Sequence, residues 1–115
     1  MRRWHAVIET PTYLASAKGR LSATKQEEIV NALARDPYVG VVMPGGHGLR
    51  KYRHAIGGRG KSGGARVIYY VHDEHHPLLL LAVFAKNERA DLSRAEVNDL
   101  GRLVQRLKQG MKRRP

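Results

Sequence analysis

The hydrophobic and polar positions of this 115-residue chain divide it into alternating strand-like and helix-like segments. Residues 4–9 and 49–56 are short strand candidates, and residues 65–72 (ARVIYYVH) are rich in the β-branched and aromatic side chains that favour strands. Residues 78–85 (LLLLAVFA) are apolar without alternation, which is typical of a strand buried on both faces. The pattern therefore predicts a sheet with one central, fully covered strand.

Three other segments have the signals of helices. Residues 11–17 begin with proline, which is tolerated in a first helical turn. Ser22 or Thr24 caps a second helix, which Asp36-Pro37 ends. The last helix begins with a capping box and continues with one apolar stripe at 3-4-3-4 spacing: Ser93 and Glu96, then Val97, Leu100, Val104, Leu107 and Met111.

The predicted order is β-α-α-β-β-β-α, in which three consecutive strands form an antiparallel meander with helices packed on it. This is an α+β fold. A chain of this length forms one domain, residues 1–115, and its basic tail from about residue 110 is expected to fray. Trp4 is expected to anchor the core. Tyr69 and Tyr70 point to opposite faces of their strand, so that one is buried and the other is open for stacking.

The charge of the chain changes this picture most. It has 21 Lys and Arg against 10 Asp and Glu, a formal net charge of +11. No acidic residue lies between Asp36 and Asp73, an interval that holds the cations Arg50, Lys51, Arg53, Arg59, Lys61 and Arg66. A solvated charged face is the simpler reading of such a run. Six cations without a compensating acid favour instead a surface that binds the phosphates of a polyanion.

The glycine-rich stretch 55–64 superficially suggests a phosphate-binding P-loop. That motif needs G-x-x-x-x-G-K-[ST] between a strand and a helix, but the position of its first glycine is Ala55 here. Gly63, Gly64 and a strand follow Lys61-Ser62, so there is no helix N-terminus to hold a phosphate. A nucleotide hydrolase of this type is excluded. The loop is better explained as a cationic connection between two strands.

Other site classes have weaker support. The chain has no cysteine, which excludes a disulfide framework and thiolate metal ligation and is consistent with the cytoplasm. His72, His75 and His76 match no standard zinc spacing and are interpreted as part of a polar hairpin turn, so no metal or cofactor is expected. The N-terminus lacks the apolar core of a signal peptide, and residues 78–85 are too few to span a bilayer.

The strand cations suggest chemistry at a phosphodiester. Because side chains alternate along a strand, Lys51 and Arg53 share one side, and Arg66 opens the next strand close by. Facing a phosphodiester, such cations neutralise its charge and the additional charge of a pentavalent transition state. The alternative is that all three are exposed, solubilising residues.

Lys86 follows the buried strand directly, a frequent position for functional residues on a rigid scaffold. Neighbouring cations disfavour a further positive charge, so a fraction of this lysine could be neutral and act as a base. A lysine that extends into solvent explains the position equally well.

Two long segments resemble the RelE/HigB-type toxins of bacterial type II toxin–antitoxin systems, and the HigB-like branch most closely. They are GGHGLRKYRHAIGGRGKSGGARVIYYV and LLLLAVFAKNERADLSRAEVNDL, and the resemblance extends from Pro11 to about Val104. It implies a small RelE-like domain that enters the ribosome and cuts mRNA without a metal ion. In that chemistry the ribose 2′-OH attacks the adjacent phosphate and leaves a 2′,3′-cyclic phosphate. It also implies a cognate antitoxin, expected to be a helix-turn-helix protein, with operator DNA bound only through the antitoxin complex.

The resemblance also assigns residues. It implies catalytic roles for the strand cations and for the lysine of the K-N-E segment: Lys51, Arg53, Arg66 and Lys86. It implies RNA or ribosome binding by neighbouring residues and by the glycine loop: Arg50, Arg59, Lys61, Tyr70 and Asn87.

Three positions depart from the family pattern. Asn87 stands where RelE has an arginine, and Ser93 lies near the place of a RelE tyrosine that has no match here. Phe84 stands where the HigB-like branch often has a tyrosine, so the general acid and base remain open. Two other functions also remain as alternatives: a ParE-like inhibitor of DNA gyrase, and a non-catalytic protein that binds nucleic acid.

Overall fold

The structure is a computed structural model that describes residues 4–55 and 64–113. It has three helices and a five-stranded sheet, which confirms the predicted α+β class. The elements are, in order, β1 (Val7–Glu9), α1 (Pro11–Ala17), α2 (Ala23–Arg35), β2 (Val41–Val42), β3 (Arg50–His54), β4 (Ala65–Tyr70), β5 (Leu78–Ala85) and α3 (Arg94–Arg113). None of the described helices is long and apolar enough to cross a membrane.

The strands lie in the order β1-β5-β4-β3-β2. Strands β3, β4 and β5 pair antiparallel with their sequence neighbours, so the predicted meander is confirmed. The sheet is nevertheless mixed, because β1 pairs parallel with β5. The edge strand β2 was not predicted, since its two residues are too few to show any periodicity.

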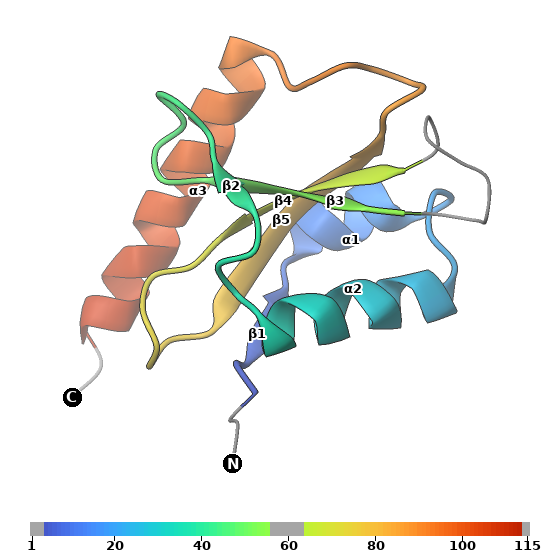
Figure 1. The fold of residues 1–115 in the computed structure, drawn as a ribbon. Coiled ribbons are helices and arrows are strands. Elements are labelled where there is room, and N and C mark those ends of the chain that lie inside the picture. The colour runs from blue at the N-terminus through green and yellow to red at the C-terminus, as the bar shows by residue number, and fades with distance from the viewer. Residues whose placement is uncertain (1–3, 56–63, 114–115) are drawn as a thin grey trace.

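Helices cover both faces of the sheet, with α1 and α2 on one side and α3 on the other (Figure 1). Alternate residues of β4 and β5 enter the two cores: Val67, Tyr69 and Leu80 pack with α1 and α2, whereas Ile68 and Leu81 pack with α3. Six of the eight residues of β5 are buried, which confirms the prediction of a strand covered on both faces.

Side-chain caps explain where the helices begin. Thr10 caps α1 by accepting a hydrogen bond from the backbone N–H of Tyr13, and Ser22, rather than Thr24, caps α2. At the start of α3 the Ser93 hydroxyl accepts from the N–H of Glu96, and the Glu96 carboxylate accepts from the N–H of Ser93. The predicted capping box is therefore present.

Two expectations about exposure are wrong. Trp4 is 51% exposed, with the Arg35 guanidinium 5.0 Å from its ring centroid, and it does not anchor the core. Tyr69 and Tyr70 are both buried, because the sheet has a helical layer on each side. Helix α3 is described as far as Arg113, and fraying of the tail from about residue 110 stays a prediction.

Candidate nucleic-acid interface

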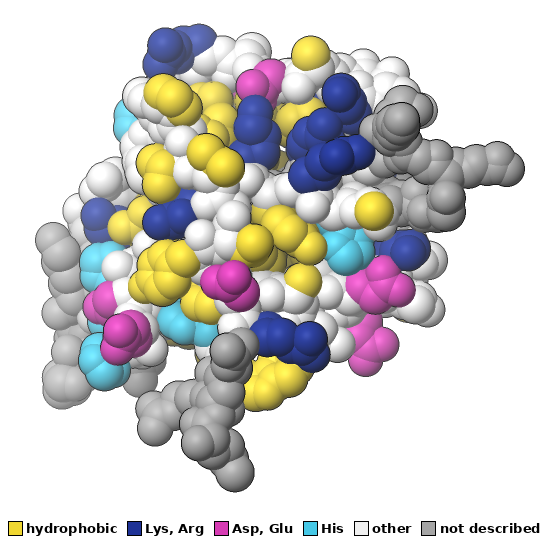
Figure 2. All heavy atoms as spheres, in the orientation of Figure 1, with side chains coloured by type: hydrophobic (Ala, Val, Ile, Leu, Met, Phe, Trp, Pro, Cys, Tyr) yellow, Lys and Arg dark blue, Asp and Glu magenta, His cyan; other side chains and the backbone are white. Residues whose placement is uncertain are grey.

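Three cations lie on the α3 side of the sheet, on the neighbouring strands β3 and β4. Arg53 lies directly opposite Arg66 in the antiparallel ladder, and Lys51 lies opposite Ile68, a residue of the α3-side core. Because side chains alternate along a strand, Lys51, Arg53 and Arg66 share one face, which we call the cationic face. In Figure 2, Lys and Arg side chains gather on this part of the surface, between β3 and the loop that precedes α3.

The two arginines converge over Gly64. A Cβ atom at Gly64 would lie 3.4 Å from Arg53 Nε and 3.4 Å from Arg66 Nη1. Arg66 Nη1 is buried and has no hydrogen-bond partner within residues 4–55 and 64–113. A buried guanidinium nitrogen without an acceptor is unfavourable by about 1–3 kcal/mol or more. The position therefore suits an incoming anion that supplies the missing acceptor.

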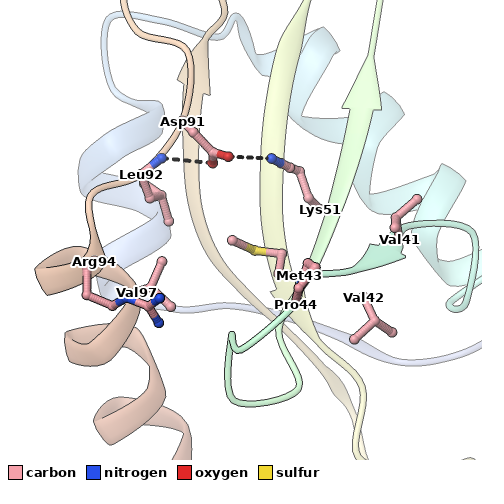
Figure 3. Close-up of a pocket in the computed structure, with 9 residues that line it drawn as sticks. All are labelled: Val41, Val42, Met43, Pro44, Lys51, Asp91, Leu92, Arg94 and Val97. Atoms are coloured by element: carbon pink, nitrogen blue, oxygen red, sulfur yellow. Dashed lines mark hydrogen bonds and ion pairs between the residues drawn. The ribbon is translucent and has the colours of Figure 1, made fainter.

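Lys51 is held by a carboxylate that the sequence reasoning did not single out. Its Nζ donates to Asp91 Oδ2 at 2.8 Å, and the backbone N–H of Leu92 donates to Asp91 Oδ1 at 2.8 Å (Figure 3). The hydrogen bond from Lys51 is the main reason that the pKa of Asp91 lies below its usual value. Asp91 belongs to the A-K-N-E-x-x-D-L-S sequence, but only the fold brings it to Lys51.

A hollow of about 530 Å³ adjoins this ion pair. Lys51 and Asp91 form its polar end, and side chains from β2, the following turn and α3 form the rest, including Val41, Met43 and Val97 (Figure 3). Its rim includes Arg94. The hollow therefore combines an apolar wall with the charged groups of Lys51, Asp91 and Arg94.

Lys86 and Asn87 lie at the beginning of the loop that joins β5 to α3. The backbone N–H of Lys86 donates to the carbonyl of Gly64 at 3.2 Å, so this lysine begins beside the glycine over which the two arginines converge. The side chains of Lys86 and Asn87 are exposed. Of the predicted catalytic residues, Arg53, Arg66 and Lys86 thus lie beside Gly64, and Lys51 lies farther along β3 on the same face.

Glu88 connects the loop after β5 to Arg20 through a bidentate ion pair. Arg20 donates from Nε and Nη2 to the two carboxylate oxygens of Glu88, at 2.7 and 2.9 Å, and thereby ties the loop to the end of α1. These bonds, followed by one from the N–H of Ala85, lower the pKa of Glu88 to about 2. The bidentate geometry limits how far Lys86 and Asn87 can move.

A second ion pair connects the same loop to α3. Arg89 forms hydrogen bonds with both carboxylate oxygens of Glu96, and its guanidinium lies 5.7 Å from the ring centroid of Phe84. The bonds from Arg89 are the largest cause of the lowered pKa of Glu96, about 2. Phe84, which stands where the HigB-like branch often has a tyrosine, is buried in the α3-side core.

Some predicted residues do not join this group. Arg50 lies on the opposite side of β3, where its guanidinium donates to the carbonyls of Gly40 and Tyr38 and stacks on the Tyr38 ring. Tyr70 is only 8% exposed, with Lys108 over its ring, so it offers no open face for a base. Arg59 and Lys61 lie outside the described residues.

Comparison with known protein families gives one match that spans most of the chain. Residues 16–113 match the family model described as the RelE toxin of the RelE/RelB toxin–antitoxin system. The matched segment includes all strands from β2 to β5, helix α3 and the three residues of the cationic face. The match confirms the resemblance to RelE, and the HigB-like branch stays a prediction.

Proposed function

Because the chain belongs to the RelE family of toxins, we propose that it is a ribosome-dependent endoribonuclease that cuts mRNA without a metal ion. RelE toxins generally inhibit translation as endoribonucleases, and the family pairs each toxin with an antitoxin. The proposal that this site cuts RNA rests on Arg66. Its Nη1 is buried and lacks an acceptor within the described residues, and the residue lies directly across the ladder from Arg53. A phosphodiester supplies the acceptor oxygens.

The proposed reaction is an internal displacement at phosphorus. The ribose 2′-OH loses its proton and attacks the adjacent phosphate, the bond to the 5′-oxygen breaks, and that oxygen takes up a proton. The products are a 2′,3′-cyclic phosphate and a 5′-hydroxyl. Arg53 and Arg66 donate to the non-bridging oxygens, which gain negative charge in the pentavalent transition state. Lys51 exchanges Asp91 for the phosphate and adds a third positive charge.

A metal ion is not needed for charge neutralisation at this place, because the cationic face supplies it. Among the described residues, the one group of side chains that could jointly hold a metal is His72, Asp73 and His76, in the turn between β4 and β5. That turn and the loop before α3 lie at opposite ends of the sheet (Figure 1). A metal bound there is remote from the cationic face.

Lys86 is the proposed proton-transfer residue, and two substitutions separate this role from a purely electrostatic one. Lys86→Ala removes both the charge and the base, whereas Lys86→Arg keeps the charge but cannot deprotonate at neutral pH. If Lys86 transfers a proton, both variants lose cleavage. If Lys86→Arg cleaves as the parent does, the residue acts by its charge alone.

The wider setting follows from the same proposal. A toxin that acts on translating ribosomes works in the cytoplasm, and its antitoxin is expected to be a helix-turn-helix protein that brings the pair to operator DNA. Arg59 and Lys61 of the glycine loop are proposed to contact RNA backbone, with Asn87 at the edge of the cationic face. Arg50 and Tyr70 are the least favoured contacts, because one is engaged with Gly40 and the other is buried.

The test is primer extension on cellular mRNA after a short pulse of expression, with the parent chain and a folded Arg66→Ala variant side by side. Discrete cuts within translated frames, present for the parent and absent for the variant, support the proposal. DNA breaks with intact mRNA would indicate gyrase inhibition instead. Growth arrest without any cleavage would indicate a non-catalytic binding protein. Purified ribosomes with a defined mRNA then show whether cleavage needs the ribosome.

A further inference from the structure

A cluster of potential metal ligands lies far from the cationic face, in the turn between β4 and β5. His72, Asp73 and His76 each contribute one ligand atom, and these atoms all lie within 4.8 Å of one another. Figure 2 shows histidine and acidic side chains together at this end of the molecule. The spacing His-Asp-x-x-His matches no standard zinc motif, so only the folded turn reveals the cluster.

The carboxylate at the centre of the cluster has a defined orientation. Asp73 Oδ1 accepts hydrogen bonds from the backbone N–H groups of His75 and His76, at 2.8 and 3.0 Å. His76 Nδ1 lies 2.7 Å from the same oxygen, and His72 Nε2 lies 3.8 Å from Asp73 Oδ2. Ligand atoms around a tetrahedral zinc ion, each about 2.0–2.1 Å from it, lie about 3.3 Å apart. Small side-chain rotations therefore suffice to enclose an ion.

A neighbouring hydroxyl can accept a hydrogen bond from the metal-coordinating form of His72. The Tyr70 hydroxyl lies 3.4 Å from His72 Nδ1, and the Tyr70 ring is buried in the α3-side core. When Nδ1 carries the proton and donates to this oxygen, the lone pair of Nε2 points toward Asp73. Contacts of this kind to the second ring nitrogen are typical of metal-binding histidines. His5 Nε2 also contacts the carbonyl of His76 at 2.8 Å and so braces the other end of the turn.

We propose that His72, Asp73 and His76 form a binding site for a borderline divalent metal ion, with Zn²⁺ as the representative case. Two imidazoles and one carboxylate suit zinc and its neighbours rather than Mg²⁺ or Ca²⁺, which prefer all-oxygen sites. The three side chains are 26–41% exposed, so an ion reaches them from solvent and water completes its coordination. The bound ion would cross-link the turn that connects the two central strands.

The test is zinc binding by the full-length chain, produced without a polyhistidine tag and stripped of metal with a chelator. Zn²⁺ is titrated against a chromogenic chelator, and the absorption of Co²⁺ in the visible range reports on the ligand set. The parent is compared with His72→Gln and His76→Gln. His75→Gln is the matched control, because His75 lies in the same turn outside the cluster. Tyr70→Phe tests the contact to His72.

The expected result is saturable binding of one equivalent that raises the melting temperature. His72→Gln and His76→Gln weaken binding at least about 10-fold, whereas His75→Gln leaves it within about twofold; Tyr70→Phe has an intermediate effect. Circular dichroism without metal shows that each variant is folded. The proposal is overturned if the parent shows no saturable binding, or if the His75 variant loses as much affinity as the His72 variant. None of these measurements uses RNA cleavage, so they stand apart from the toxin proposal.

Discussion

Arg53 on β3 and Arg66 on β4 lie directly opposite each other in the antiparallel ladder, and their guanidinium groups converge over Gly64. Like charges directly opposite in a sheet are destabilising, and Arg66 also buries a nitrogen without an acceptor in the described part of the chain. A phosphate between the two groups would supply the missing acceptor to Arg66 and reduce the repulsion between the charges. This is the physical basis for the proposal that the reaction occurs there.

The first prediction separates Arg66, the proposed catalytic arginine, from Arg50, whose contacts are structural. Arg66→Ala should reduce cleavage about 10²–10³-fold, because one preorganised donor to the transition state is lost, while the melting temperature is kept or raised. Arg66→Lys should recover little, since an ammonium cannot reproduce the bidentate guanidinium contact. Arg50→Ala should do the reverse: it should lose about 1–3 kcal/mol of stability with its bonds to Gly40 and Tyr38, and it should still cut mRNA.

Cleavage on purified ribosomes and thermal melting, measured on the same preparations, check this contrast. An Arg66→Ala variant that is folded and cuts as fast as the parent would place the active site elsewhere.

The second prediction concerns the ion pair between Lys51 and Asp91. RNA must compete with the carboxylate for Lys51, so Asp91→Asn should tighten the binding of single-stranded RNA. A partly exposed pair contributes about 0.2–1 kcal/mol, which corresponds to a gain of up to about fivefold in affinity. Asp99→Asn is the matched control, because it makes the same change in net charge at an exposed pair on α3. Fluorescence anisotropy at several salt concentrations is the measurement.

If Asp91→Asn instead weakens binding while Asp99→Asn does not, the carboxylate positions Lys51 and does not compete with RNA.

The third prediction is a pH dependence that originates at Glu88. Its folded pKa, about 2, lies below that of an unfolded glutamate, about 4.3, because of the hydrogen bonds from Arg20 and the N–H of Ala85. The stabilisation is therefore present above about pH 4.3 and is lost as the pH falls through about 2. Glu88→Gln should melt below the parent near pH 6, and the two melting curves should converge near pH 2. A difference that is constant over this range would contradict the assigned cause.

The fourth prediction uses two glycines of α3. Glycine in a helix interior is about 1 kcal/mol less favourable than alanine, so Gly110→Ala, with no atom within 4 Å of the new Cβ, should raise the melting temperature by a few degrees. At Gly101 the Cβ would lie 2.6 Å from Cγ of His47, a residue that also contacts Asn98. Gly101→Ala should therefore destabilise the packing of the 43–48 turn on α3 and lower the melting temperature.

Thermal melting of the two variants in parallel distinguishes the effects. A gain at Gly101 equal to the gain at Gly110 would show that His47 moves aside without cost.

The sequence alone determined the helices and the three central strands, because each has a local signal. The Ser93–Glu96 capping box starts α3, Asp36-Pro37 ends α2, and the unbroken apolar run 78–85 identifies the strand with two covered faces. Alternation also placed Lys51 and Arg53 on one side of their strand. These signals depend on residues within a few positions of each other, and the fold leaves them unchanged.

Only the tertiary structure determined the strand pairings, contacts and burial that depend on residues far apart in the chain. The parallel pairing of β1 with β5 and the contact between Lys51 and Asp91, which are 40 positions apart, have no local signal. The register between β3 and β4 set Arg66 opposite Arg53, where alternation could say only that the two were close. Burial of Tyr70 followed from α3, because a second helical layer covers the face that one strand alone leaves open.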